Sequence, residues 1–248
     1  MNKIAIIIPS RLEAIRLPNK PLQLINKKEM ILHVYEAAKK SNAGEVYVAT
    51  PDQKIFDLIQ NSGGEAVLTS FDHQTGTDRV YEVFKKHLKS IPNVVVNLQG
   101  DMPNIDPKVI TNLVSYMNKG RCDIGTLASS FNSDEEIDDE NNVKVAVKEK
   151  LKNDQYGQAI DFFRKKEETD YEYFYHHVGI YAFTNKALLR YVSLKRSKLE
   201  LERKLEQLRA IENSMTIHVG YINSSPLSVD TKNDLISVRK MMENNEKN

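Results

Sequence analysis

Short apolar runs rich in β-branched residues alternate with helical patterns through the first half of the chain. The runs, at residues 4–8, 46–50, 66–69 and 94–98, have the length and composition of buried strands. Apolar residues at helical spacing follow at 30–38, 80–88 and 107–117. Parallel strands need long crossover connections, so this alternation predicts a Rossmann-like α/β fold whose mostly parallel sheet is flanked by helices.

The second half of the chain is less regular. Strand patterns occupy 123–129, 143–147, 178–183 and 216–222, one helix is predicted from about 200 to 212, and another follows Asp230. The acidic run "SDEEIDDENN" is typical of a solvated turn or short helix. Because no repeat or linker-like segment divides the sequence, we predict one domain over 1–248 with an elaborated, strand-rich region at about 130–195.

Composition excludes several classes of protein. The 248 residues carry a net charge of only +1, so no broad field favours nucleic acid. The single cysteine, Cys122, rules out an internal disulfide and a cysteine-based zinc cluster. No Gly-x-Gly-x-x-Gly follows the first strand, which argues against a dehydrogenase. The apolar run that ends at Pro9 is too short for a signal peptide or membrane span, so we expect a cytoplasmic protein without a membrane partner.

The loop after the first strand carries three cations, Arg11, Arg16 and Lys20, and no glycine precedes Gly44. Ligands of parallel sheets bind at the carboxyl ends of the strands, which is where this loop lies. A phosphate bound there would be neutralised largely by side chains, with Arg supplying a planar fork and Lys a point charge. The alternative is an ordinary solvated surface.

Two carboxylates extend this pattern. Asp101 follows the strand at 94–98, and Asp230 precedes the last helical pattern. Each has a simpler interpretation, Asp101 as a turn residue and Asp230 as a helix N-cap. Together they suit Mg²⁺, which prefers oxygen ligands and is usually shared with substrate phosphates. Cations for a triphosphate and carboxylates for its metal are the parts that a phosphate-displacement site needs.

Six segments, in this order, carry a family resemblance: "IIIPSRLEAIRLPNKPL", "HQTGTDR", "VNLQGDMP", "HHVGIYAF", "KLEQLRAIE" and "SVDTKNDL". From about residue 4 to beyond 235 the chain resembles the 3-deoxy-manno-octulosonate cytidylyltransferases, or CMP-Kdo synthetases. The resemblance implies a nucleotidyltransferase fold and transfer of CMP from CTP to the anomeric hydroxyl of Kdo, with release of pyrophosphate, for lipopolysaccharide biosynthesis. It implies no covalent enzyme intermediate.

The resemblance also assigns roles to residues. It implies that Lys20, Asp101 and Asp230 are catalytic and that the two carboxylates bind Mg²⁺. The nucleotide would contact Pro9, Ser10, Arg11, Arg16, Lys20, His73, Gln74, Gly76, Thr77 and Arg79. The sugar would contact Gln99, Arg164, His177, Glu206 and Gln207. A homodimer formed through the second half is also implied, with "YEYFYHHVGIYAF" either at its surface or in a core strand.

Three of these roles have structural alternatives. "TGTDR" fits a helix N-terminus capped by threonine, a role that can coexist with nucleotide binding. His177 fits a hydrogen-bonded structural histidine. Glu206 fits a pair with Glu202 and Arg209 along an exposed helix face.

The chain departs from the family pattern at three places. Met102 replaces a common glutamate, "IDFFRKKEETD" replaces a segment that usually reads Tyr-Phe-Ser-Arg before Ile-Pro, and Asn19 replaces a glycine. Asparagine tolerates left-handed geometry, so the last change is mild. Two other functions stay open: a cytidylyltransferase for another acid sugar, such as 8-amino-Kdo or a sialate, and a catalytically silent nucleotide-binding homologue.

Overall fold

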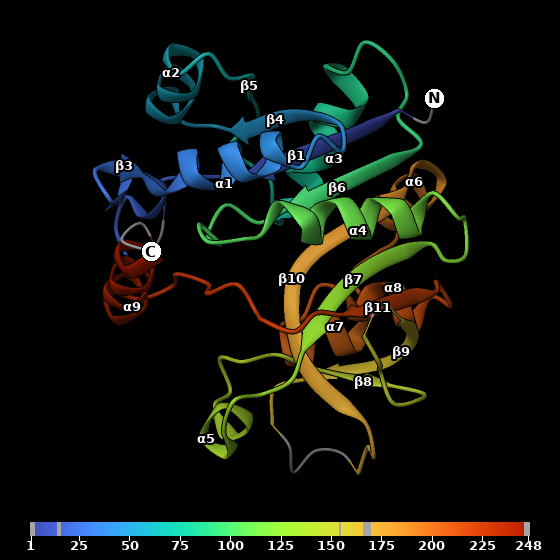
Figure 1. Ribbon diagram of the computed structural model, residues 1–248. Coiled ribbons are helices and arrows are strands. Elements are labelled where there is room, and N and C mark those ends of the chain that lie inside the picture. The colour runs from blue at the N-terminus through green and yellow to red at the C-terminus, as the bar shows by residue number, and fades with distance from the viewer. Residues whose placement is uncertain (1–2, 14–15, 154, 166–169, 246–248) are drawn as a thin grey trace. The chain divides into compact units, whose positions relative to one another are not determined.

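The computed structural model describes residues 3–13, 16–153, 155–165 and 170–245 (Figure 1). The chain forms two compact units. The first unit combines Met1–Val114 with Pro226–Asn248, and the second unit is Ser115–Ser225. The second unit contains the region at 130–195 that the sequence marks as elaborated, while the single domain over 1–248 stays a prediction.

The sheet of the first unit has four strands: β1 (Ile4–Pro9), β4 (Glu45–Thr50), β5 (Ala66–Leu68) and β6 (Val94–Leu98). Their order is β5-β4-β1-β6, and every pair is parallel. All four strands predicted from the first half are therefore confirmed. Ile6, Ile7 and Ile8 are completely buried, as expected for strands covered on both faces.

Helices connect these strands. Helix α1 (Met30–Lys40) links β1 to β4, α2 (Gln53–Asn61) links β4 to β5, and α3 (Gly76–Lys86) links β5 to β6. Right-handed crossovers put α1 and α3 on opposite faces, because the chain reverses its direction across the sheet at β5. Figure 1 shows α1 in front of β1 and α3 behind it. Helix α4 (Pro107–Met117) follows β6, and the Asp106 carboxylate accepts the Lys108 N–H at 2.9 Å, as predicted for an N-cap.

The segment between β1 and α1 folds into short elements that meet the end of the chain. They are a 3₁₀ turn, η1 (Lys20–Leu22), and a small hairpin of β2 (Leu24–Ile25) and β3 (Lys28–Glu29). Helix α9 (Lys232–Asn245) completes the first unit. One buried cluster joins the two segments, and it consists of Leu17, Ile25, Met30, Val229, Leu235 and Val238.

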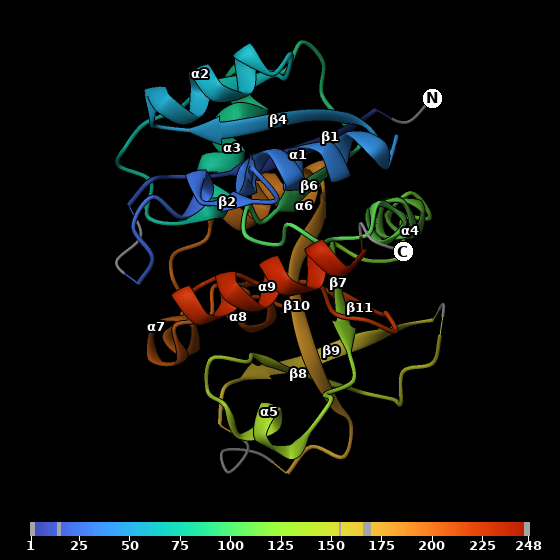
Figure 2. The same ribbon diagram turned by 60° about the vertical axis from the view of Figure 1, so that its left-hand side comes forward.

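The second unit is built on five strands: β7 (Ile124–Ser129), β8 (Lys144–Val147), β9 (Tyr156–Phe163), β10 (Phe174–Thr184) and β11 (Ile217–Tyr221). Their order is β10-β7-β11-β9-β8, and β8 also pairs with β10, so the pairing closes on itself. The β11–β7 pair is parallel and the other described pairs are antiparallel. Figure 2 shows β8 and β9 alongside each other. The sequence reading missed β9.

The helices of the second unit correct one prediction. Helices α5 (Asp134–Asp138) and α6 (Asn185–Ser193) are accompanied by α7 (Lys198–Arg203) and α8 (Leu208–Glu212). The single helix predicted over 200–212 is therefore wrong. Lys204 has a left-handed backbone (φ 54°, ψ 44°), which ends α7. Arg209 of α8 then donates hydrogen bonds of 2.7 and 2.8 Å to the buried Glu200 of α7.

Candidate functional site

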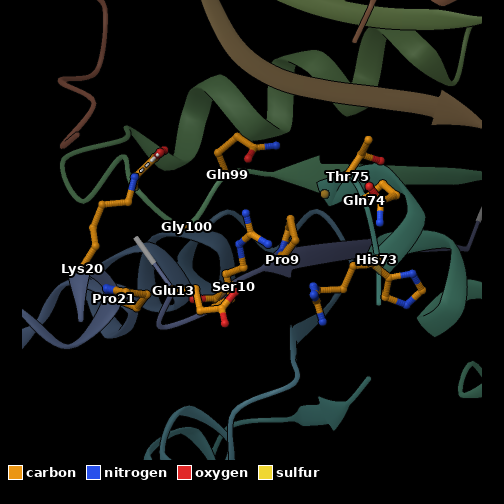
Figure 3. A pocket seen from close by; sticks show the side chains of 14 residues that line it. Pro9, Ser10, Glu13, Lys20, Pro21, His73, Gln74, Thr75, Gln99 and Gly100 are labelled. Carbon is orange, nitrogen blue, oxygen red and sulfur yellow. Dashed lines mark hydrogen bonds and ion pairs between the residues drawn. The ribbon is translucent and has the colours of Figure 1, made fainter. Parts of the chain in front are cut away.

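A cavity of about 290 Å³ opens at the carboxyl ends of β1 and β6, beside the start of α3 (Figure 3). Its size is at the lower end for small-molecule sites. The lining residues are Pro9, Ser10, Arg11, Glu13, Lys20, Pro21, His73, Gln74, Thr75, Gly76, Arg79, Gln99, Gly100 and Asp101. Gln99 and Thr75 lie across it from Pro9 and Ser10. Three of the sequence segments that predict the site thus meet in one cavity.

Lys20 connects the two predicted metal ligands. Its Nζ lies 3.0 Å from Asp101 Oδ2 and 3.0 Å from Asp230 Oδ1. Arg16 Nη2 lies 3.1 Å from the other oxygen of Asp230. Burial by itself lowers the pKa of Lys20, but the two carboxylates more than offset this and raise it. Burial likewise raises the pKa of Asp230, and Lys20 and Arg16 reverse the shift, so the pKa of Asp230 is lowered.

Backbone hydrogen bonds bring these distant residues together. The Val229 N–H donates to the Asp101 carbonyl at 2.9 Å, and the Leu227 N–H donates to Asn104 Oδ1 at 2.9 Å. Asn19 adopts the left-handed conformation (φ 52°) that its residue type favours, and it leads directly into Lys20. The first unit therefore holds Lys20, Asp101 and Asp230 through the backbones next to them.

Asp230 is not the N-cap of α9, so that simpler interpretation is wrong. The Asp234 N–H donates to Thr231 Oγ1 at 3.2 Å, while the Asp234 carboxylate accepts the Thr231 N–H at 2.7 Å. This reciprocal pair caps the helix. Asp234 also accepts the Asp230 N–H at 3.0 Å. The cap lies one residue further on, so the Asp230 carboxylate is left to pair with cations.

The loop after β1 is held by a residue that sequence reasoning missed. The Asp52 carboxylate accepts the Leu12 N–H at 2.8 Å, next to Arg11. Asp52 follows the carboxyl end of β4 as Asp101 follows that of β6, so the same position in the sheet could have singled it out. The Ser10 N–H already donates to the Ala49 carbonyl at 2.9 Å. Ser10 Oγ is buried and has no hydrogen-bond partner within the described part of the chain, so a ligand could use it.

Two side chains of α3, Glu82 and Arg79, hold the segment that precedes the helix. His73 Nε2 lies 2.5 Å from Glu82 Oε2, which also accepts the Ser70 N–H at 2.9 Å. Arg79 donates to the Thr69 hydroxyl and to the Ser70 carbonyl, the latter at 3.0 Å. Burial and the nearby Arg11 lower the pKa of Arg79. Glu82 is the second residue that the sequence did not reveal, because its role depends on where His73 and Ser70 lie.

The start of α3 is capped as the alternative reading of "TGTDR" predicts. Thr75 accepts the Asp78 N–H at 3.2 Å, and the Asp78 carboxylate accepts the Thr75 N–H at 3.2 Å. Thr75 lines the cavity, whereas Thr77 is buried and receives a 3.3 Å hydrogen bond from the Asn97 amide. A Cβ on Gly76 would meet the Pro9 side chain at an ordinary 3.5 Å, so packing does not require glycine there.

The burial of Met102 accounts for one departure from the family pattern. Its side chain is only 3% exposed and belongs to the core. A carboxylate at this position would be buried, so the methionine adds packing rather than a metal ligand. Among the described residues, no group of three or more His, Cys, Asp or Glu side chains converges as a metal site. A cation held by Asp101 and Asp230 would therefore need further oxygens from a phosphate or water.

Most predicted sugar contacts lie in the second unit, while Gln99 lies in the cavity of the first. There Gln99 donates to Asn97 Oδ1 at 3.0 Å. Arg164 donates to the Glu140 carbonyl at 2.8 Å. Glu206 and Gln207 occupy the turn between α7 and α8. The exposed-helix pairing suggested for Glu206 requires a helix that is broken at Lys204.

His177 fits its structural alternative. It is buried on β10, and its Nε2 lies 3.0 Å from Thr126 Oγ1. Burial lowers its pKa to about 3, with a smaller contribution from His176, so the ring is neutral near pH 7. A neutral ring of this kind can serve as a hydrogen-bonding group but supplies no charge for a sugar carboxylate.

The altered segment at residues 161–164 also has a local function. The Asp161 carboxylate is buried and accepts hydrogen bonds of 2.9 and 2.8 Å from Arg203 Nη1. It also accepts hydrogen bonds from the Tyr171 hydroxyl at 3.2 Å and from the Phe162 N–H at 2.8 Å. Asp161 thus fastens β9 to the end of α7, which accounts for a carboxylate where the family pattern has tyrosine.

Sequence comparison places the chain in a family. The family model described as Cytidylyltransferase matches residues 5–217. A 3-deoxy-manno-octulosonate cytidylyltransferase from Rickettsia felis is 41% identical in an alignment of 246 positions that covers 97% of this chain and 96% of the relative. The chain belongs to the 3-deoxy-manno-octulosonate cytidylyltransferase family. Another family member, from Paramagnetospirillum magneticum, is 37% identical over 96% of both chains.

Comparison with solved structures supports the same family assignment. A CMP:2-keto-3-deoxy-manno-octonic acid synthetase complexed with CTP superposes with a TM-score of 0.87 at 35% identity, covering 98% of this chain and 99% of that one. A cytidylyltransferase from Leptospira borgpetersenii, at 18% identity and a TM-score of 0.61, covers 100% of this chain and 96% of its own and shares the fold. The mixed α/β nucleotidyltransferase fold predicted from the sequence is thereby confirmed. Across the described residues, no helix is both long and apolar enough to cross a bilayer.

Proposed function

We propose that this cytidylyltransferase transfers CMP from CTP to the anomeric hydroxyl of Kdo. The sugar oxygen forms a bond to the α-phosphorus, the bond from that phosphorus to the oxygen bridging to the β-phosphate breaks, pyrophosphate leaves with that oxygen, and the hydroxyl proton passes to solvent. The observation that carries the proposal is Lys20 between Asp101 and Asp230, at the cationic cavity of a chain 41% identical to a named family member. This geometry suits displacement at a phosphate.

The chain's own residues would act on the triphosphate by position and charge. Arg11, Lys20 and Arg79 line the cavity and would neutralise charge as pyrophosphate departs. Asp52 would hold the loop that carries Arg11, and Glu82 would hold His73 in the segment before α3. The Ser10 N–H is already used by the Ala49 carbonyl, so Ser10 would bind the nucleotide through its hydroxyl, which has no hydrogen-bond partner among the described residues. The predicted contacts from Pro9, Arg16, His73, Gln74, Gly76 and Thr77 stay part of the proposal.

Asp101 and Asp230 would hold Mg²⁺. The donor set fits a hard cation, because both carboxylates already converge on a shared positive charge at Lys20 Nζ, 3.0 Å from each. When bound, the metal would neutralise phosphate charge and lower the pKa of the attacking hydroxyl.

The sugar would be bound by the predicted contacts Gln99, Arg164, His177, Glu206 and Gln207. Their polar groups suit a polyhydroxylated acid. A cytoplasmic site of action, a homodimer and supply of lipopolysaccharide biosynthesis stay predictions from the family resemblance. The relatives from Rickettsia felis and Paramagnetospirillum magneticum are both named as Kdo cytidylyltransferases, which favours Kdo over another acid sugar. The contacts of Lys20 with Asp101 and Asp230 favour an active enzyme over a silent homologue.

Pyrophosphate release with CTP and Mg²⁺ tests the proposal directly. We expect release with Kdo and much less with 8-amino-Kdo, a sialate or no sugar. Asp101→Ala should lose most of this turnover while keeping a wild-type unfolding temperature to within a few degrees. Equal activity of Asp101→Ala would remove the metal assignment, and release with another sugar only would remove the Kdo assignment.

A further inference from the structure

The Lys20 ammonium lies where two carboxylates share one cation. It is 3.0 Å from an oxygen of each, and its side chain is 19% exposed against 23% for Asp101. The pair with Asp101 is therefore partly buried, and buried charge pairs are screened less by water and salt than exposed ones. Arg16 supplies a second cation to Asp230 at 3.1 Å. Two positive charges thus already balance two negative ones at this site.

A divalent cation would need the same carboxylate oxygens. An ammonium at 3.0 Å and a metal bound to those oxygens exclude each other by volume and repel each other by charge. We propose that Lys20 acts as an internal counterion that occupies the metal position of the free protein and must leave before Mg²⁺ can bind. This inference rests on the proposed function for the identity of the metal.

The structure also provides a partner that could draw Lys20 away. The Lys20 side chain lines the same cavity as Arg11 and Arg79, where the triphosphate would bind. Its long, flexible stem allows the ammonium to turn from carboxylates to phosphate without movement of the backbone. The nucleotide would thus supply a new partner for Lys20 and free Asp101 Oδ2 and Asp230 Oδ1 together, while Arg16 keeps its contact with the other oxygen of Asp230. The metal is then expected to bind with the nucleotide and only weakly to the protein alone.

Binding of Mn²⁺ to the nucleotide-free protein tests this, with free Mn²⁺ measured by electron paramagnetic resonance. Lys20→Met removes the internal cation, and we expect it to bind Mn²⁺ about tenfold or more tightly than wild type. Lys28→Met is the matched control, because Lys28 also pairs with a carboxylate, Glu36 at 2.7 Å, but lies outside the cavity. The control should bind Mn²⁺ as weakly as wild type.

A second substitution tests whether the tighter Mn²⁺ binding depends on Asp101. Asp101→Asn added to Lys20→Met should abolish the tight binding, since it removes one of the two carboxylates. Lys20→Gln gives the same comparison if the methionine variant does not fold. Mg²⁺ should also raise the unfolding temperature of Lys20→Met more than that of wild type.

Either of two outcomes would overturn the inference: Mn²⁺ bound by the Lys20 variants no more tightly than by wild type, or tight Mn²⁺ binding by the nucleotide-free wild type. The measurement uses no CTP, no sugar and no turnover. A protein without transferase activity would therefore refute the proposed function and leave this test intact.

Discussion

Glu82 makes several interactions through one partly buried side chain, including one with His73, which lines the cavity. It pairs with His73 and Lys86 and accepts the Ser70 N–H. Burial by itself raises its pKa, but these hydrogen bonds more than offset that and lower the pKa to about 2 from the ordinary 4.5. The folded-state pKa is below the unfolded one, so the stabilisation is present above about pH 4.5 and is lost as the pH falls toward 2.

Glu82→Gln is therefore expected to lower the free energy of unfolding by about 3 kcal/mol near pH 7 and by roughly half as much near pH 3. Urea unfolding of both proteins between pH 3 and 7 measures the difference. Glu36→Gln removes an exposed carboxylate from the pair with Lys28 and should change the free energy of unfolding by at most about 1 kcal/mol. A loss for Glu82→Gln that is the same at pH 3 and pH 7 would contradict the assignment.

At the scale of residues, the sequence identifies groups whose chemistry follows from their place in the fold. Asp101 is at the end of a buried strand, and Lys20 and Arg11 are in the loop after another, so their meeting in one cavity could be predicted. The residues that hold the cavity-lining loops in place were not predictable in the same way. Asp52 and Glu82 act on the backbones of Leu12 and Ser70, and such contacts leave no residue pattern.

At the scale of elements, α9 links the core to the site. Leu235 is 3% exposed and belongs to the cluster with Leu17 and Met30, whereas the next residue, Ile236, is 53% exposed. The same helix is capped by Thr231, directly after Asp230. Packing of Leu235 therefore helps to set where the Asp230 carboxylate lies.

Leu235→Ala should lower the free energy of unfolding by about 2–4 kcal/mol, because it leaves a cavity in this cluster. Ile236→Ala is the matched control and is expected to change it by about 0.5 kcal/mol or less. Denaturant unfolding of the two variants gives the comparison. Equal losses in both would show that α9 does not pack through Leu235.

The elements that the sequence predicts best are those that are buried on both faces. β1, β4, β5 and β6 are short and rich in apolar, β-branched residues, and this length and composition favour buried strands. The break between α7 and α8 gave no signal, because Lys204 adopts a conformation that usually marks glycine or asparagine. β9 was missed because Asp161, inside the strand, interrupts its apolar pattern and is neutralised by Arg203.

At the scale of the whole molecule, the division into two units was beyond sequence reasoning. The first boundary lies at Val114, inside α4, and no composition change marks it. The first unit is discontinuous, since Pro226–Asn248 joins Met1–Val114, whereas the second unit is continuous. A hydrophobic pattern shows which face of its own helix or strand is buried, but not which distant segment packs against that face. The patterns therefore could not show that the last segment completes the core of the first unit.

A chain that stops after Ser225 should keep a folded second unit and expose the core around Leu17, Ile25 and Met30. The reason is the loss of Val229, Leu235 and Val238 from their shared cluster. Hydrogen exchange measured by mass spectrometry should show faster exchange in residues 16–32 than in the full chain. A chain that stops after Glu243 keeps these side chains and is the control. Equal protection in both shortened chains would disprove the expectation.

The hydrogen bond from Val229 to Asp101 has a consequence for the time at which the enzyme becomes able to act. A ribosome makes Lys20 and Asp101 early, but Asp230 only after the whole second unit has been made. Domains can fold during translation as soon as their segments have emerged. The second unit can therefore fold on a nascent chain, while the Lys20–Asp101–Asp230 group assembles only after Asp230 has emerged.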